Sequence, residues 1–473
     1  MTRNVALILI DTVRKDYFDE YAPRLQAMSD ISIDRCRAAS SWSVPSHASM
    51  FTGDLPSEHD IHTHDRVFDL ERSDTFLAGV PHGAYGASSN VYASSTFGFD
   101  AIFDEYRDVA PHRIFPAGMD MEQFVQERET DETDGARRFL EFFRTALAHD
   151  APAKTLVNGV VFKLNATMRT APVPKLIDDG ARAIGSQLVE LARTRPEPLF
   201  LFANFMDAHA PHQHVLGYDR SIHDAPYGWS SLEFETWDRM ADRNEVPERE
   251  FRRDRRYHRQ LYAAAIDYLD RTVTDTIERL RDETAGETTV VVTADHGENL
   301  GYDADDGLFD HTSSLTDGLV HVPLEIINPP EGMDAPDDGE YVTHLDLGEL
   351  IVDIADEDRE ASVPTREIAP AELIGCGLGV PDDVDDEYWD RMIRAVYRDD
   401  RKYEWDSMGN TFVYDVSGTS HQKLRSDGDG VPDWCRDEFD VPIEAYKDKA
   451  RRESEAVDLD EATVSRLEDL GYV

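Results

Sequence analysis

Three unbroken apolar runs constrain the fold of this chain more than any other feature. They are "NVALILI" at 4–10, "PLFLFANF" at 198–205 and "TTVVVTA" at 288–294, with "GAYGASSN" at 83–90 as a weaker fourth. A strand with one face in water alternates apolar and polar residues, whereas a continuous apolar run fits a strand that is covered on both faces. We therefore predict a mostly parallel sheet that is buried between helices.

Helical patterns lie between these runs. Residues 263–283 place apolar side chains at helical spacing with charges elsewhere, and residues 184–194 show a similar pattern. Strands that alternate with helices are typical of a doubly wound α/β domain.

The pattern changes after about residue 390. The segment "RAVYRDDRKYEWDSMGNTFVYDV" contains two alternating stretches on either side of Gly409 and Asn410, which predicts an antiparallel hairpin. We therefore assign residues 1–390 to the main α/β domain. Residues 391–473 form a smaller C-terminal subdomain with this hairpin and a terminal helix.

The charge of the chain is as unusual as its apolar runs. It has 96 acidic residues against 48 lysines and arginines, a net charge of −48, and only eight of the basic residues are lysines. Acidic residues dispersed along the whole length are typical of a surface adapted to very high salt, where self-repulsion is screened. Such a surface disfavours a nucleic-acid partner, which would need basic groups.

The cysteines and the N-terminal run bear on the compartment. Cys36, Cys376 and Cys435 lie far apart without paired spacing, so we expect neither a disulfide framework nor a zinc site. The first apolar run is too short to cross a bilayer, and no signal-peptide cleavage pattern follows it. We expect a cytoplasmic protein.

Polar residues follow each of the three strong strands. Asp11 follows the first, Asp207 and His209 follow the second, and Asp295 and His296 follow the third. Taken singly, such an aspartate often caps a helix and such a histidine is often solvated. Ligands of open α/β sheets, however, bind at the carboxyl ends of the strands. Carboxylates and an imidazole gathered at one edge favour a divalent-cation site.

The stretch "SWSVPSHASMFTG" at 41–53 places a serine hydroxyl at the start of a helix. On this stretch alone the simpler interpretation is capping, with Ser43 as N-cap, Pro45 in the first turn and Gly53 as the stop. The other interpretation is chemical. A helix N-terminus attracts phosphate or sulfate, and a hydroxyl there can attack the anion or complete the cation site.

An ordered set of motifs decides between these interpretations. "LILIDTVRKD", "SVPSHASMFTG", "LPSEHDIHTH", "MDAHAPH", "TADHGENLG", "DHTSSLTDGLVHVPLEI" and "THLDLGELIVDIA" follow one another as in the sulfatases of the alkaline phosphatase superfamily, and the ending "LDEATVSRLEDLGYV" is similar too. The chain resembles this family over nearly its full length. The resemblance implies an alkaline-phosphatase-like fold, a mixed and mostly parallel sheet flanked by helices, with residues 1–390 as its catalytic domain.

The resemblance also implies roles for individual residues. Ser43 takes the nucleophile position. One divalent metal ion, Ca²⁺, Mn²⁺ or Mg²⁺, is held by Asp11, Ser43, Asp295 and His296. His209 and His311 flank the ester oxygen as catalytic residues, and His47 and Asn90 contact the substrate. A second metal through Asp207, His212 or His344 is not required by the spacing.

Three positions depart from the sulfatase pattern. His47 replaces the arginine that the machinery for converting the signature residue to formylglycine reads, so formylglycine at Ser43 lacks its usual signal. Thr12 stands where many sulfatases have a second metal-binding aspartate, and His311 stands where lysine is common. These changes point toward phosphatase, phosphodiesterase and phosphonate-hydrolase relatives, some of which use an unmodified serine or threonine.

The main hypothesis is a metal-dependent hydrolase of sulfate or phosphate esters, acting on an anionic small molecule or glycan ester. The alternative is a transferase that passes a phospho- or sulfo-group to an alcohol or glycan acceptor. A third hypothesis is a protein that binds anionic glycans without turnover. The retained Asp11, Ser43, Asp295 and His296 argue against that third hypothesis.

Residues 151–175 are basic in an acidic chain. Lys154, Lys163, Lys175 and Arg169 lie here without any acidic residue. Apolar residues recur at helical spacing at Leu156, Val160, Val161, Leu164 and Met168. This predicts either a surface helix packed on the domain or a basic amphipathic lid. Such a lid would lie beside the active site or in weak contact with an anionic membrane surface.

Overall fold

The architecture was analysed in a computed structural model of the chain. The structure describes residues 3–111, 115, 117–119, 121, 124, 135–168, 173–233, 248–337, 339–356, 361–377, 386–416, 420–450, 463–464 and 467. Among these residues, no helix combines the length and the apolar character that a membrane crossing needs.

The centre of the molecule is a seven-stranded sheet with the order β2-β8-β7-β1-β6-β4-β5. Five of the strands are parallel, and β8 runs antiparallel to both of its neighbours, which confirms the predicted mixed, mostly parallel sheet. The strands are β1 (Asn4–Ile10), β2 (Ile31–Ile33), β4 (Gly83–Ser88), β5 (Glu105–Asp108), β6 (Leu199–Phe205), β7 (Thr288–Thr293) and β8 (Leu324–Ile327).

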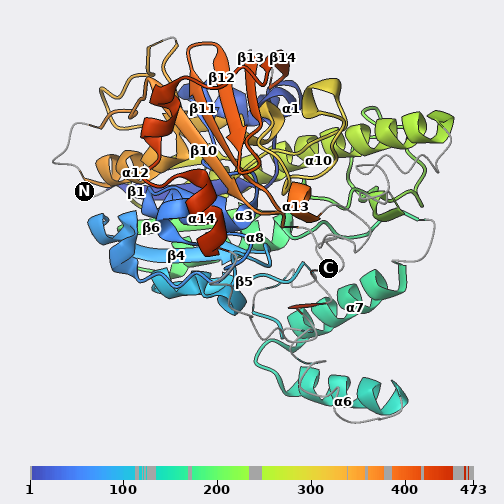
Figure 1. Ribbon diagram of the computed structural model, residues 1–473. Coiled ribbons are helices and arrows are strands. Elements are labelled where there is room, and N and C mark those ends of the chain that lie inside the picture. The colour runs from blue at the N-terminus through green and yellow to red at the C-terminus, as the bar shows by residue number, and fades with distance from the viewer. Residues whose placement is uncertain are drawn as a thin grey trace.

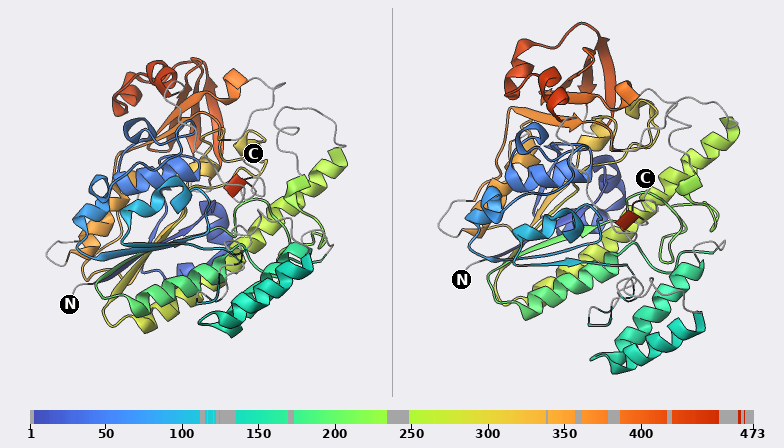
Figure 2. Two further views of the ribbon diagram at one scale, coloured as in Figure 1. Left: turned by 90° about the horizontal axis from the view of Figure 1, so that it is seen from below. Right: turned by 60° about the horizontal axis from the view of Figure 1, so that its bottom comes forward.

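The apolar runs form the three central strands. β1 covers the seven residues predicted, and β6 and β7 fall inside their predicted runs. Every residue of these three strands is buried, because helices cover both faces of the sheet (Figure 2). α8 (Ala181–Thr194) packs on β6 and on α10 (Glu248–Glu283), whereas α12 (Leu347–Ala355) packs on β1 and on α3 (Ser43–Thr52).

The remaining helices are shorter or lie apart from the sheet. α6 and α7 project from the body as a helical pair (Figure 1). The helices not yet given are α1 (Lys15–Tyr21), α2 (Pro23–Met28), α4 (Pro56–His59), α6 (Gly135–Ala148), α7 (Pro152–Met168), α11 (Asp317–Val320), α13 (Asp386–Trp389) and α14 (Ile443–Ala450).

A second, antiparallel sheet has the order β10-β11-β12-β13-β14. β12 and β13 form the predicted hairpin around Gly409 and Asn410. The sheet begins earlier than the boundary at 391, because β10 pairs along its whole length with β11. The predicted terminal helix lies almost wholly outside the described residues. The strands are β10 (Ile368–Ile374), β11 (Met392–Arg398), β12 (Arg401–Asp406), β13 (Thr411–Val416) and β14 (Gln422–Asp427), and β3 (Cys36–Arg37) pairs with β9 (Val342–Thr343) in a small separate sheet.

Candidate active site

The predicted metal ligands converge at the carboxyl edge of the central sheet. β1 and β7 are hydrogen-bonded neighbours, so Asp11, after β1, lies beside Asp295 and His296, after β7. One ligand atom from each of the three residues lies within 4.8 Å of the others, and all three side chains are buried. Among the described residues this is the only such group, so no second metal cluster accompanies it.

Ser43 points into this group and does not cap its helix. It is the first residue of α3, where Trp42 takes the N-cap position and no side chain caps the helix. Its Oγ lies 3.0 Å from Asp295 Oδ2 and 3.4 Å from His296 Nε2. Gly53 ends the helix in the left-handed region, with φ of 82°. The capping interpretation of Ser43 is therefore wrong, and that of Gly53 is confirmed.

Asp11 is a buried carboxylate with spare capacity to bind a cation. Its Oδ2 accepts hydrogen bonds from Asn90 Nδ2 at 2.8 Å and from Asn204 Nδ2 at 3.3 Å. Its Oδ1 has no hydrogen-bond partner among the described residues. Burial, followed by the charge of Asp295, raises the pKa of Asp11 well above its usual value. An orphaned oxygen next to a second carboxylate fits a divalent cation.

His296 presents a free lone pair to the same point. Its Nδ1 lies 2.8 Å from the carbonyl oxygen of Gly297, and a carbonyl only accepts, so Nδ1 carries the hydrogen. Burial lowers the pKa of His296 to about 4, which keeps the ring neutral near pH 7. Burial opposes ionisation of Asp295, but His296, His47 and the Ser43 hydroxyl outweigh it and lower the pKa of Asp295 to about 2. A neutral imidazole with carboxylates and a hydroxyl suits Mn²⁺, Mg²⁺ or Ca²⁺.

Asn90 holds the serine hydroxyl from the other side. Its Nδ2 donates to Ser43 Oγ at 2.9 Å as well as to Asp11, and its Oδ1 accepts from the Tyr92 N–H at 2.9 Å. The amide therefore bridges the nucleophile position and a metal ligand. The structure brings this residue into the site, and its contact with substrate stays a prediction.

His47 supports the site from behind. Its Nδ1–H donates to the Ser43 carbonyl at 2.7 Å, and its Nε2 accepts from Asn204 Nδ2 at 2.8 Å. The side chain is fully buried, and burial lowers its pKa. With both ring nitrogens engaged, His47 has none left for a substrate. The geometry gives it a positioning role in place of the predicted substrate contact.

His209 and His311 face each other across the site, with ring centroids 5.0 Å apart, and His311 lies 4.7 Å from His296. The Nδ1 of His311 is 3.0 Å from Glu298 Oε2. Burial raises the pKa of Glu298 to about 8 and lowers that of His311 to about 4, so the pair keeps one proton between these values. Burial also lowers the pKa of His209 to about 4.

Two site residues escaped the sequence analysis. Asn204 is the one amide inside the apolar run of β6, and this interruption of the run was the only feature of the sequence that pointed to it. Glu298 lies two residues after His296 in the motif "TADHGENLG", in which only Asp295 and His296 were assigned roles. Its contact with His311 depends on how two loops meet, which local pattern does not reveal.

Asp207 has the simpler role considered for it. Its two carboxylate oxygens each accept at 3.0 Å, from the N–H groups of Asp179 and Ala181 at the start of α8. The ring centroids of His212 and His258 are 4.7 Å apart, and His344 Nε2 lies 3.2 Å from the Thr293 hydroxyl oxygen. None of these residues belongs to the metal group, so the second metal gains no support.

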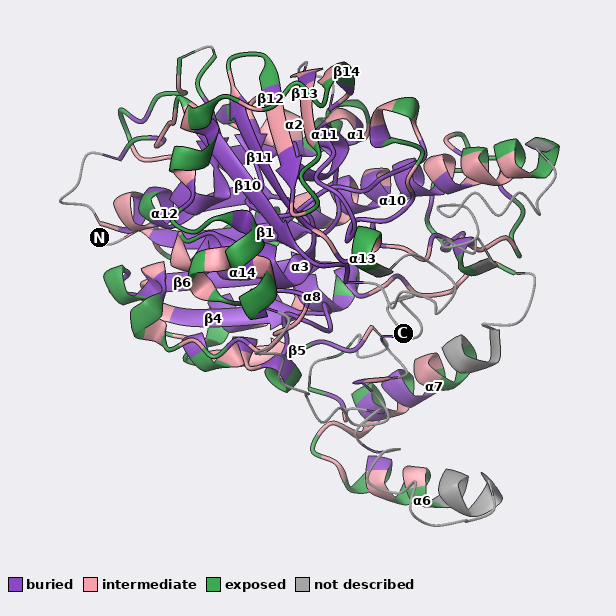
Figure 3. Cartoon of the chain, in the orientation of Figure 1, coloured by how far each residue is buried: buried purple, intermediate pink, exposed green. Residues whose placement is uncertain are grey.

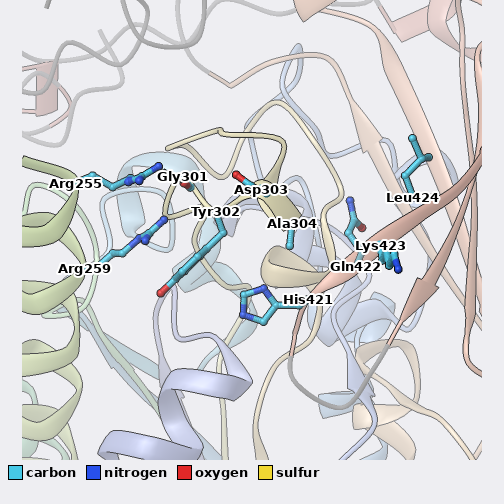
Figure 4. Close-up of a pocket in the computed structure, with 10 residues that line it drawn as sticks. All are labelled: Arg255, Arg259, Gly301, Tyr302, Asp303, Ala304, His421, Gln422, Lys423 and Leu424. Atoms are coloured by element: carbon cyan, nitrogen blue, oxygen red, sulfur yellow. Dashed lines mark hydrogen bonds between the residues drawn. The ribbon is translucent and has the colours of Figure 1, made fainter. Parts of the chain in front are cut away.

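A cavity of about 510 Å³ lies elsewhere, between α10, the loop at 301–304 and β14 (Figure 4). Arg255 and Arg259 reach it from α10, and the Arg259 guanidinium stacks 3.5 Å over the Tyr302 ring. None of the predicted site residues lines this cavity. The chemistry-bearing group is therefore a buried strand-edge cluster and is separate from this cavity.

Comparisons with known proteins agree with this geometry. The family described as Sulfatase matches residues 3–357. An uncharacterized sulfatase of Escherichia coli K12, YidJ, is 31% identical over 116 residues, which are 24% of this chain and 22% of that protein. The matched segment therefore spans about a fifth of that relative.

Solved structures share the fold over most of the chain. Phosphonate monoester hydrolase of Agrobacterium radiobacter superposes with a TM-score of 0.57 at 14% identity, covering 87% of this chain and 89% of that one. A putative sulfatase from Bacteroides thetaiotaomicron gives 0.55 at 13% identity, covering 98% and 96%. The two-sheet architecture is thus that of these proteins.

Proposed function

The chain belongs to the sulfatase family, and from this premise we propose that it is a metal-dependent hydrolase of phosphate or sulfate esters with Ser43 as its nucleophile. One observation carries the proposal. The Ser43 Oγ lies 3.0 Å from Asp295 Oδ2 and 3.4 Å from His296 Nε2, at the first residue of a helix. A nucleophile, metal-type ligands and a helix N-terminus therefore meet at one point.

The hydrogen bonding of Asp11 shows why these residues fit a divalent cation. Its Oδ1, which has no hydrogen-bond partner among the described residues, and the second carboxylate leave buried negative charge that no described lysine or arginine contacts. A cation held by Asp11, Ser43, Asp295 and His296 would lower the pKa of the serine hydroxyl and offset charge on the transferred group. His296 favours Mn²⁺ among the candidates, because imidazole suits transition metals.

The chain's own residues orient the attack. Asp295 Oδ2 accepts the hydroxyl hydrogen of Ser43, and Asn90 Nδ2 holds the same oxygen, so its remaining lone pair is directed. The first N–H groups of α3 are not used within the helix and can receive the anionic oxygens of the ester, although Pro45 has none to offer.

The reaction has two steps. Ser43 Oγ passes its proton to Asp295 Oδ2 and forms a bond to phosphorus or sulfur, while the bond from that atom to the ester oxygen breaks. The leaving alkoxide takes a proton from an imidazole. We assign that donor to His311, which gives its Nε2 proton to the alkoxide while its Nδ1 takes the proton held by Glu298. His209 then contacts the non-bridging oxygens. Water then attacks phosphorus or sulfur and gives a proton back to the Glu298–His311 pair, the bond to Ser43 Oγ breaks, and Ser43 recovers its hydrogen from Asp295.

An unmodified serine favours phosphate over sulfate. A phosphoserine intermediate is open to attack by water at phosphorus. A sulfoserine has no second hydroxyl on its Cβ with which to expel sulfate, and formylglycine supplies one in sulfatases that carry it. His47 stands in place of the arginine that this modification requires, so phosphate or phosphonate esters are the better-supported substrates. The transferase alternative has no specific observation in its favour.

Turnover of an aryl phosphate and an aryl sulfate, before and after chelation, tests this proposal. We expect turnover of the aryl phosphate, loss of activity on chelation, and recovery when Mn²⁺, Mg²⁺ or Ca²⁺ is added. Adding an alcohol separates transfer from hydrolysis, because a transferase would yield the phosphorylated alcohol. Absence of turnover of both esters in the presence of each metal would refute the proposed function.

A further inference from the structure

Helix α7 packs on the protein through its polar and small residues. Asn158 Nδ2 donates to the carbonyl of Phe115 at 3.0 Å, and its Oδ1 accepts from the N–H of the same residue at 3.1 Å. Thr155 Oγ1 accepts from the Met119 N–H at 3.1 Å. Gly159 is buried against α6. The polar Thr155 and Asn158 thus take buried positions of α7, beside the half-buried Phe162, where a surface helix normally places apolar residues alone.

The outward face of α7 is apolar. Val157, Val160 and Leu164 are 43%, 56% and 44% exposed. Their spacings of three and four residues place them, with the exposed Ala153, in one stripe on the side opposite Thr155 and Asn158. The sequence analysis predicted an apolar stripe that included Leu156, Val160, Val161 and Leu164. Of that stripe, Val160 and Leu164 face outward and Leu156 and Val161 are half-buried, whereas the side chain of Met168 lies outside the described part of the chain.

Basic residues border this stripe. Lys154 and Lys163 are both exposed and fall on its two sides at helical spacing. The neighbouring helix α6 adds two exposed apolar residues one turn apart, Phe143 at 37% and Leu147 at 66%, with the exposed Arg144 between them. Figure 3 shows this helical pair at the periphery of the molecule, away from the buried core.

The local charge opposes that of the chain. Residues 135–168, which span the two helices, contain five lysines and arginines against Glu141 and Asp150, a net charge of +3 within a protein of net charge −48. An apolar stripe bordered by long basic side chains is the arrangement of helices that lie in a membrane interface. There the basic side chains extend toward lipid phosphates while their stems cover apolar surface.

We propose that the α6–α7 pair docks the protein on an anionic lipid surface. Val157, Val160 and Leu164 enter the boundary between headgroups and acyl chains, and Lys154 and Lys163 contact the phosphates. The pair projects from the body, so it can reach a bilayer while the acidic body stays away from it (Figure 1). Docking is on the surface, in keeping with the absence of a membrane-crossing helix among the described residues.

Sedimentation of the full-length protein with vesicles tests this proposal. Vesicles of pure phosphatidylcholine are compared with vesicles of equal parts phosphatidylcholine and phosphatidylglycerol, at low salt and at rising salt. We expect binding to the anionic vesicles only, and weaker binding as salt rises. The double variant V160S/L164S should lose binding with little change in melting temperature, since these side chains are about half exposed.

Charge variants and matched controls complete the experiment. K154Q/K163Q should bind anionic vesicles about 25-fold more weakly, at about fivefold for each lysine removed. The control L216S/L424S removes two leucines of the body that are 55% and 53% exposed, and it should bind as the parent does.

Three outcomes would overturn the proposal. The parent could stay in solution with anionic vesicles at low salt, or V160S/L164S could bind as tightly as the parent. The parent could also form a dimer that V160S/L164S dissociates, which would make the stripe an interface between copies of the chain. None of these readouts depends on catalysis, so their failure leaves the proposed function standing.

Discussion

The strand-edge site and helix α7 break the same packing rule in opposite directions. The site buries Asp11, Asp295 and His296 completely, although charged groups are normally left in water. Helix α7 leaves Val160 and Leu164 in solvent while burying Asn158. Each arrangement costs free energy, and a ligand or surface that contacts it would offset that cost.

The kind of residue found in the unexpected place indicates which ligand or surface each region would contact. The buried Oδ1 of Asp11, which lacks a partner among the described residues, indicates a cation, because positive charge replaces the hydration that a buried carboxylate has lost. Exposed apolar side chains flanked by lysines indicate an apolar phase with an anionic border. The strand-edge cluster is therefore suited to bind a metal ion and a small ester, whereas the outward face of α7 is suited to contact a lipid surface.

The largest expected effect is on the nucleophile. Ser43→Ala should lower kcat at least about a thousandfold, as loss of a covalent nucleophile does. The protein should still fold, with a stability loss of about 1–2 kcal/mol from the lost hydrogen bonds to Asp295 and Asn90, because Ser43 caps no helix. The matched control is Ser46→Ala, a buried serine of the same helix whose Oγ donates to the Ser40 carbonyl at 3.1 Å. It should cost about 1 kcal/mol of stability and leave kcat within a few-fold of the parent.

A second test removes one of the two facing carboxylates. Asp11→Asn abolishes the like-charge repulsion with Asp295, so the metal-depleted variant should unfold at a higher temperature than the metal-depleted parent. Added Mn²⁺ at about 100 times its dissociation constant should stabilise the parent by about 2.7 kcal/mol and the variant far less. Calorimetry with and without metal measures both effects. A metal-depleted variant that melts below the parent would mean that the carboxylate pair is not strained.

The smallest expected effect compares the two faces of α7. Gly159→Ala would place a Cβ 2.2 Å from Cζ of Phe142 and should destabilise the helical pair by about 1–3 kcal/mol. Val160→Ser, one residue further on, should change stability by less than about 0.5 kcal/mol. Hydrogen exchange within α6 and α7 reports both. An equal loss of protection in the two variants would show that the outward face is packed after all.

The two regions also differ in how far the sequence predicts them. Asp11, Ser43, Asp295 and His296 were identified because each follows a strand or opens a helix within a motif, and the order of strands then brings them together. The bounds of β1 followed from its apolar run alone. The spacing of the apolar residues also predicts that the segment of α7 is helical.

What remained hidden depends on contacts between distant segments. Periodicity shows which residues of α7 share a face, but not which face is buried, because Phe115 and Met119 decide that through Asn158 and Thr155. The engagement of both nitrogens of His47 needed Asn204 from another strand. The early start of the second sheet needed the pairing of β10 with β11, across a segment without strand pattern.

The central claim is that an unmodified Ser43 forms the covalent intermediate. It is tested most directly by mixing the metal-loaded enzyme with an aryl phosphate, quenching in acid during turnover, and measuring the intact mass and the peptide that contains residue 43. We predict a resting enzyme with the full mass of serine and a quenched enzyme that carries one phosphoryl group on Ser43. A phosphoryl group on another residue, an enzyme that turns over without any adduct, or a resting peptide lighter by two hydrogens would contradict the claim.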